Sequence, residues 1–172
     1  EKYLLEALQI REEVYGVKHN EYADMQGRLG SLYYEMGDYN KSEEYHQSAL
    51  DTRFKLYGKN HKEYANSLVK LGWYHNSLGN YKKSEEYYLE ALSIRKELYG
   101  EDHPNYKSLF TSLGSLYYNK GDYNKAQGYY EQSLKYYLDK YGKRHQNYSS
   151  GLINLQRVFS EKGDYDKAEK YL

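Results

Sequence analysis

The chain repeats the same residues every 42 positions. A Gly-Asp-Tyr or Gly-Asn-Tyr motif begins at Gly37 and recurs 79 − 37 = 42 positions later at Gly79, then at 121 and 163. A Tyr-Gly pair keeps the same step at Tyr15, 57, 99 and 141, and a histidine does so at His19, 61, 103 and 145. A fixed period of this length is typical of stacked arrays of small units. Such arrays offer a long surface to a partner and seldom a catalytic pocket.

Composition excludes several classes of site. The 25 Lys and Arg residues balance the 25 Asp and Glu residues, and this zero net charge argues against a nucleic-acid or anionic-membrane partner. Cysteine is absent, so disulfides and thiolate metal sites are excluded. This fits a reducing compartment, and we expect an intracellular, cytoplasmic location. The chain begins at Glu1 with no methionine, so we expect it to be a piece of a longer protein.

Each 42-residue unit predicts two amphipathic helices. Leu68, Leu71 and His75 lie at spacings of 3 and 4, which places them on one helical face. Gly79 favours the end of that helix, and Pro104 suits a first helical turn. The expected helices span residues 1–15, 20–36, 39–57, 62–78, 81–99, 104–120, 123–141, 146–162 and 165–172.

The order of small and large residues in each unit resembles the tetratricopeptide (TPR) signature. The first complete unit carries it at Leu29-Gly30, Tyr33, Gly37, Tyr39, Ser42 and Ala49, and the next at Leu71-Gly72, His75, Gly79, Tyr81, Ser84 and Ala91. The third copy holds Leu113-Gly114, Tyr117, Gly121, Tyr123, Ala126 and Ser133. The standard repeat has about 34 residues. The longer second helix and its Tyr-Gly end are similar to the 42-residue subtype of kinesin light chains and nephrocystin-3-like proteins.

This resemblance covers essentially the whole chain and implies an all-α fold. The expected architecture is a right-handed TPR superhelix, an α-solenoid of antiparallel helix pairs with about four repeats. It forms a single array over 1–172, divided into a partial first repeat at 1–36, repeats at 37–78, 79–120 and 121–162, and the start of a further repeat at 163–172. The chain departs from the pattern at Gln156, which replaces the small glycine, so a close helix approach is not predicted there. Only Pro104 fills the loop proline position.

The histidines first suggest a metal site, but their spacing opposes one. Equivalent positions in successive units lie at least about 8–10 Å apart, whereas a zinc–nitrogen bond is about 2 Å. We therefore expect His19, 61, 103 and 145 to make hydrogen bonds at helix starts. His46 and His75 occupy the positions of Tyr88 and Tyr117, so we expect them to pack as rings, with a pH-responsive site as the alternative. No metal or cofactor is predicted.

Catalytic motifs are absent from the sequence. It contains no G-x-S-x-G, Walker or H-E-x-x-H motif. Carboxylate pairs such as Glu43-Glu44 and Glu85-Glu86 recur at equivalent positions, which is more typical of a solvated helix face than of a general acid. Aromatic residues interleaved with lysine could suit single-stranded nucleic acid, but zero net charge disfavours it. We expect a protein without enzymatic activity.

The resemblance implies a concave groove lined by the first helix of each unit. The inner row by this correspondence is Asp24, Gly27, Ser31 and Tyr34; Asn66, Val69, Trp73 and Asn76; Ser108, Thr111, Ser115 and Tyr118; Ser150, Ile153, Arg157 and Ser160. Arg28, Lys70 and Asn154 lie one step aside. Trp73 occupies the position of Ser31 and Ser115, so the fold does not require a ring there, which favours contact with a partner over packing between units. The candidate partner-binding residues are Tyr34, Lys70, Trp73, Asn76, Thr111, Tyr118, Asn154 and Arg157.

These observations favour a protein–protein interaction scaffold that holds a peptide or protein segment in the groove. End-to-end self-association is an alternative, because Glu1-Lys2-Tyr3-Leu4 is identical to Glu169-Lys170-Tyr171-Leu172 and the two segments are in phase. A sensor or adaptor role within a larger signalling or motor complex is another.

Overall fold

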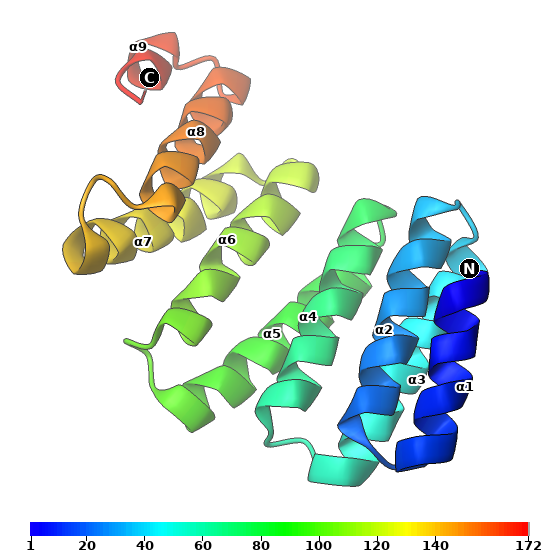
Figure 1. Cartoon of the computed structure of the whole chain (residues 1–172). Helices are drawn as coiled ribbons and strands as arrows, with labels where there is room; N and C mark the ends of the chain where they lie inside the picture. The colour runs from blue at the N-terminus through cyan, green and yellow to red at the C-terminus, as the bar shows by residue number, and fades with distance from the viewer. Residues whose placement is uncertain (172) are drawn as a thin grey trace.

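The computed structural model describes residues 1–171, and these residues form helices and turns without strands. The nine helices of this described part are α1 (Lys2–Tyr15), α2 (Asn20–Glu35), α3 (Tyr39–Tyr57), α4 (Lys62–Ser77), α5 (Tyr81–Tyr99), α6 (Pro104–Asn119), α7 (Tyr123–Tyr141), α8 (Gln146–Glu161) and α9 (Tyr165–Glu169) (Figure 1). The first eight agree with the predicted ranges to within one residue at each end. The predicted last helix ends earlier, at Glu169, and residue 172 lies outside the described part.

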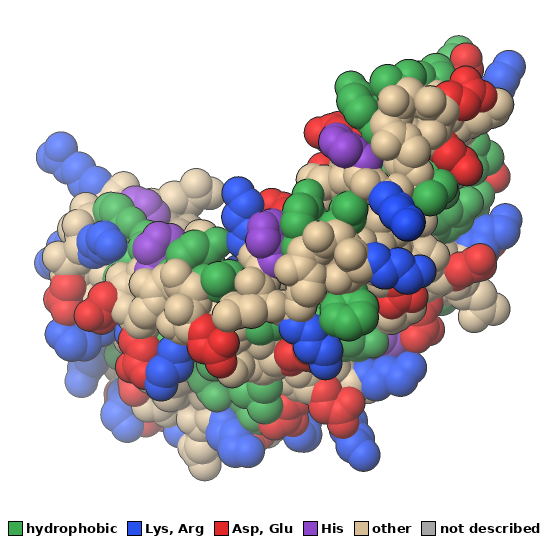
Figure 2. All heavy atoms as spheres, turned by 90° about the horizontal axis from the view of Figure 1, so that it is seen from below, with side chains coloured by type: hydrophobic (Ala, Val, Ile, Leu, Met, Phe, Trp, Pro, Cys, Tyr) green, Lys and Arg blue, Asp and Glu red, His purple; other side chains and the backbone are tan. Residues whose placement is uncertain are grey.

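The helices pack in the order in which they follow along the chain. The closest packing lies within the pairs α2–α3, α4–α5 and α6–α7, and each pair then contacts the next through α3–α4, α5–α6 and α7–α8. The two ends of the chain lie at opposite ends of the resulting array (Figure 1). Figure 2 shows that the array is bowed, with one side hollowed. The predicted all-α superhelix of helix pairs is therefore confirmed.

Glycine follows the last residue of α1, α3, α5 and α7. Gly58 follows α3 with φ 75° and ψ −177°, a conformation that is open to glycine and closed to residues with a side chain. Its N–H donates to the carbonyl of Phe54 at 2.8 Å, which satisfies the last turn of α3. After α4, Gly79 has φ 76°, which turns the chain back toward α5. These turns make neighbouring helices antiparallel.

A histidine that follows each Tyr-Gly pair caps the start of the next helix. Nδ1 of His19, His61, His103 and His145 accepts a hydrogen bond from the backbone N–H two residues later, at 3.1–3.2 Å. Each imidazole also stacks on the tyrosine four residues earlier, with ring centroids 4.0–4.8 Å apart. The predicted helix-start hydrogen bonding is confirmed. In the described residues no group of three or more His, Asp or Glu side chains could hold a metal ion.

The core depends on glycine where the two helices of a pair cross. A Cβ atom on Gly72 would lie 2.6 Å from the ring of Tyr88, and one on Gly114 would lie 2.6 Å from Tyr130. At the first crossing, a Cβ atom on Gly30 would lie 2.9 Å from the imidazole of His46. The predicted close approach is confirmed in these three repeats. In the fourth, the equivalent of the facing ring is residue 172, so the expectation for Gln156 lies outside the described residues.

Candidate functional site

The candidate residues lie on the first helix of each pair, on α2, α4, α6 and α8. We call the face of these helices that carries Tyr34, Trp73, Tyr118 and Arg157 the first-helix row. Each of the four helices has 16 residues, and neighbouring members of the row belong to successive repeats. A segment lying along the row would therefore cross several repeats.

The first aromatic contact of the row joins α2 to α4. The rings of Tyr34 and Trp73 lie 4.9 Å apart at 60°, and 47% of Trp73 remains exposed. Tyr34 also contacts Tyr39 and Tyr74, with centroids 5.6 and 6.1 Å away. Trp73 therefore packs between repeats and still presents much of its surface to solvent.

An equivalent contact joins α6 to α8 two repeats later. The guanidinium of Arg157 lies 4.6 Å from the ring centroid of Tyr118, within the range of a cation–π interaction. The Tyr118 hydroxyl donates to a carboxylate oxygen of Glu161 at 3.2 Å, and the Tyr123 hydroxyl donates to the other oxygen at 3.3 Å. Ring and guanidinium are thus held in place, and Arg157 remains exposed.

Three other candidates offer less free surface. Asn76 is only 7% exposed, and its amide oxygen accepts a hydrogen bond from Asn119 at 3.2 Å. The hydroxyl of Thr111 is hydrogen-bonded to that of Ser133 on α7 at 2.9 Å. Asn154 is half-buried. Asn76 and Thr111 thus connect helices within the array.

Two cations of the first helices, Arg28 and Lys70, lack carboxylate partners in the described part of the chain. Neither Arg28 of α2 nor Lys70 of α4 forms an ion pair or side-chain hydrogen bond within residues 1–171. The ammonium of Lys70 lies close to α2, 3.4 Å from the point where Gly27 would carry a Cβ atom. Partial desolvation and the nearby guanidinium groups of Arg53 and Arg28 lower the pKa of Lys70, while Asp24 and Glu63 oppose this shift. An incoming carboxylate would be favoured here.

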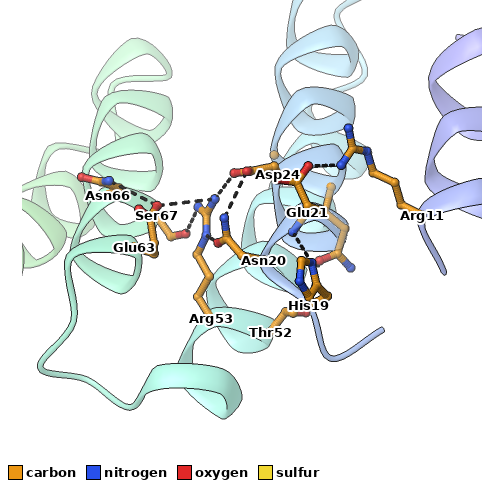
Figure 3. Close-up of polar contacts among 12 residues, drawn as sticks. Arg11, His19, Asn20, Glu21, Asp24, Thr52, Arg53, Glu63, Asn66 and Ser67 are labelled. Atoms are coloured by element: carbon orange, nitrogen blue, oxygen red, sulfur yellow. Dashed lines mark hydrogen bonds and ion pairs between the residues drawn. The ribbon is translucent and has the colours of Figure 1, made fainter. Parts of the chain in front are cut away.

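A buried arginine on α3 connects this helix to α2 and α4. Arg53 of α3 is 2% exposed and extends between α2 and α4 (Figure 3). Its guanidinium donates to Asn20 Oδ1 at 3.1 Å and to Ser67 Oγ at 2.7 Å. It also pairs with the carboxylate of Asp24 and lies 4.0 Å from that of Glu63. Asp24, predicted to line the groove, therefore also helps to hold the repeats together.

The same arginine position recurs in neighbouring repeats, a pattern that the sequence interpretation missed. Arg95 donates to Asn66 Oδ1 at 2.9 Å, to Ser108 Oγ at 3.2 Å and to the carbonyl of Asn105 at 2.7 Å. Arg11 pairs with Glu21, as Figure 3 shows. The signal was present in the sequence, because 53 − 11 = 95 − 53 = 42. Tyr137 occupies the fourth position, so the arginine column ends before α7.

A family model described as "Tetratricopeptide repeat" matches residues 1–53, 21–97, 74–139 and 108–172, which together span the chain. No curated protein gives a sequence match. No helix of the described residues is long and apolar enough to cross a membrane.

Three solved structures share the architecture. BtubC (BKLC) from P. vanneervenii is 27% identical with a TM-score of 0.77, over 88% of this chain and 61% of that one. A putative kinesin light chain of nearly identical TPR-like repeats from Podosopora anserina is 16% identical with a TM-score of 0.79, over 99% and 81%. A Rap protein complexed with Competence and Sporulation Factor is 20% identical with a TM-score of 0.73, over 88% and 41%. The last two show the fold alone, and this chain spans less than two thirds of BtubC.

Proposed function

This chain belongs to the tetratricopeptide repeat family, and we propose that it is a non-enzymatic scaffold that binds a peptide or protein segment along the first-helix row. TPR repeats generally mediate protein–protein interactions. The observation that carries the proposal is the half-exposed Trp73, which lies against Tyr34 at a position where two other repeats have serine and the fourth has Arg157. Tryptophan, tyrosine and arginine are the residues that most often dominate binding energy at interfaces.

The chemistry of the row supports a particular kind of ligand. Trp73 with Tyr34 suits an apolar side chain, and the cations Arg28 and Lys70 suit a carboxylate close to it. Arg157 on Tyr118 offers a second contact two repeats away. An extended segment that carries an apolar residue with an acidic neighbour would use the first two, and it would have to continue along the row to contact Arg157. The Rap protein structure, a complex with Competence and Sporulation Factor, is consistent with ligand binding by this fold.

Replacing Trp73 and Tyr118 together by alanine should abolish selection of such ligands. The test is a peptide-display selection on the folded wild-type chain, followed by affinity measurements on the enriched peptides. Loss of two ring anchors should weaken binding at least about 30-fold, since each anchor contributes about 1–2 kcal/mol or more. The matched control is Leu89→Ala, because Leu89 is 42% exposed but lies on α5 outside the row. Equal affinity in the folded double variant would refute binding along the row.

Self-association through α1 is a second candidate. Tyr3, Ile10 and Val14 lie on one stripe of α1 and are 82%, 51% and 65% exposed. The shared Glu-Lys-Tyr segment near the two ends favours another copy of the chain as the occupant. We expect the mass measured by light scattering to rise with concentration, and Ile10→Glu with Val14→Glu to prevent the rise. A wild-type chain that remains monomeric would eliminate this candidate.

A further inference from the structure

Two buried histidines occupy positions where the next two repeats have tyrosine or phenylalanine. His46 of α3 is 3% exposed and corresponds to Tyr88 and Tyr130, whereas His75 of α4 is fully buried and corresponds to Tyr117 and Phe159. The predicted ring packing is confirmed, since His46 covers Gly30 and His75 stacks on Tyr87 with centroids 5.5 Å apart. Packing explains a ring at each position but does not explain an imidazole.

The buried nitrogens of these imidazoles lack hydrogen-bond partners in the described structure. This applies to Nε2 of His46 and to both nitrogens of His75. Burying a charged group without partners is costly, so the packed arrangement favours neutral imidazoles. Burial and the ammonium of Lys70 lower the pKa of His46 to about 4.

The charged groups that face each imidazole come from neighbouring helices. Lys70 of α4 faces His46, whose ring lies over Gly30 of α2. Glu43 of α3 and Lys83 of α5 face His75, with Glu43 Oε1 3.6 Å from its Nε2. Burial lowers the pKa of His75; Glu43 opposes this shift and Lys83 adds to it. Glu43 already pairs with Lys83 at 3.2 Å, so it is shared between two cations once His75 is protonated.

A series of ring contacts connects both imidazoles to the exposed tryptophan. Tyr74 lies between them, with its centroid 6.1 Å from His46 and 5.0 Å from His75. Its other neighbour is Tyr34, at 6.1 Å, and Tyr34 contacts Trp73 at 4.9 Å. Tyr74 is 1% exposed and its hydroxyl donates to the carbonyl of Tyr39 at 2.7 Å. A change in the position of the Tyr74 ring would therefore also move the rings packed around it.

We propose that His46 and His75 make the Tyr34–Trp73 contact acid-sensitive. Protonation of the imidazoles loosens the packing of α3 against α2 and α4, and the two rings of the first-helix row separate as a result. The consequence for a ligand, weaker binding in acid, rests on the function proposed above. The separation of the Tyr34 and Trp73 rings does not depend on that proposed function.

The direction and size follow from the two protonation states. We call the arrangement with the Tyr34 and Trp73 rings in contact closed, and the arrangement with the rings separated open. A histidine whose pKa is lower in the closed arrangement favours that arrangement above pH 6.5 and loses this preference as the pH falls toward 4. With His46 at about 4 when closed and 6.5 when open, the open-to-closed ratio rises about 30-fold between pH 7.5 and 5. His75 adds to this in the same direction.

Trp73 supplies the measurement, because it is the single tryptophan of the chain. We expect its fluorescence emission to shift between pH 7.5 and 5 while helicity measured by circular dichroism is retained. His46→Phe and His75→Phe, singly and combined, keep a ring at each position and remove the titration. The combined variant should show no shift, although it keeps the four helix-start histidines.

Three results would overturn the proposal. The first is an unchanged Trp73 signal in the folded wild-type chain. The second is the same shift in the phenylalanine variants, and the third is loss of the signal together with all helicity. If the combined variant does not fold, the His75→Phe variant decides the question, because it introduces the residue found at Phe159: a smaller shift supports the proposal, and an unchanged shift contradicts it. No ligand is present, so the outcome is independent of the proposed binding function.

Discussion

Replacing Arg53 by alanine should lower the free energy of unfolding by about 3 kcal/mol. The guanidinium is almost fully buried and makes contacts with Asn20, Asp24 and Ser67, which belong to two different repeats. Alanine would remove these bonds, leave the hydroxyl of buried Ser67 without this donor, and empty the space of the side chain. Urea unfolding followed both by circular dichroism and by Trp73 fluorescence would measure the change.

Arg11→Ala is the matched control for this prediction. Arg11 occupies the equivalent position one repeat earlier, but its side chain is 33% exposed and its partner Glu21 is 42% exposed. Exposed ion pairs contribute about 0–1 kcal/mol, so this variant should lose less than about 1 kcal/mol. Arg53→Lys should fall between the two, because lysine keeps the charge but not the planar fork. Equal losses for Arg11→Ala and Arg53→Ala would show that the buried network does not join the repeats.

Most of the fold follows from local sequence signals. Gly58 and Gly79 end helices, and Pro104 begins one, because each residue type has a backbone preference that is independent of its neighbours in space. The 42-residue period then places equivalent helices side by side. The end of α9 was predicted less well, at 172 instead of Glu169.

The candidate site was predicted less completely, because its details depend on side chains distant in the chain. The repeat pattern places Asn76 and Thr111 on the groove face, but Asn119 and Ser133 engage them. Arg53 contacts residues up to 33 positions away, so its role is invisible in any single helix. Trp73 was identified because it differs from the serines at equivalent positions, a comparison that needs only the repeat.

Replacing Gly72 by leucine should lower the free energy of unfolding by about 2 kcal/mol. The Cβ atom alone would lie 2.6 Å from the Tyr88 ring, and leucine adds three further carbons in the same direction. Tyr88 is 2% exposed, so its ring has no solvent to move into. Overpacking of this kind costs about 1–3 kcal/mol or more, and removal of an interior helical glycine returns at most about 1 kcal/mol.

Gly128→Leu provides the control, since Gly128 lies within α7 and nothing lies within 4 Å of the position of its Cβ atom. That variant should be neutral or slightly more stable. Tyr88→Ala alone should cost about 3–5 kcal/mol because it leaves a cavity. Combined with Gly72→Leu it should cost clearly less than the sum, because the leucine side chain enters the space that the ring leaves. Additive losses in this double-mutant cycle would contradict a direct contact between residues 72 and 88, and with it the reason for glycine at positions 30, 72 and 114.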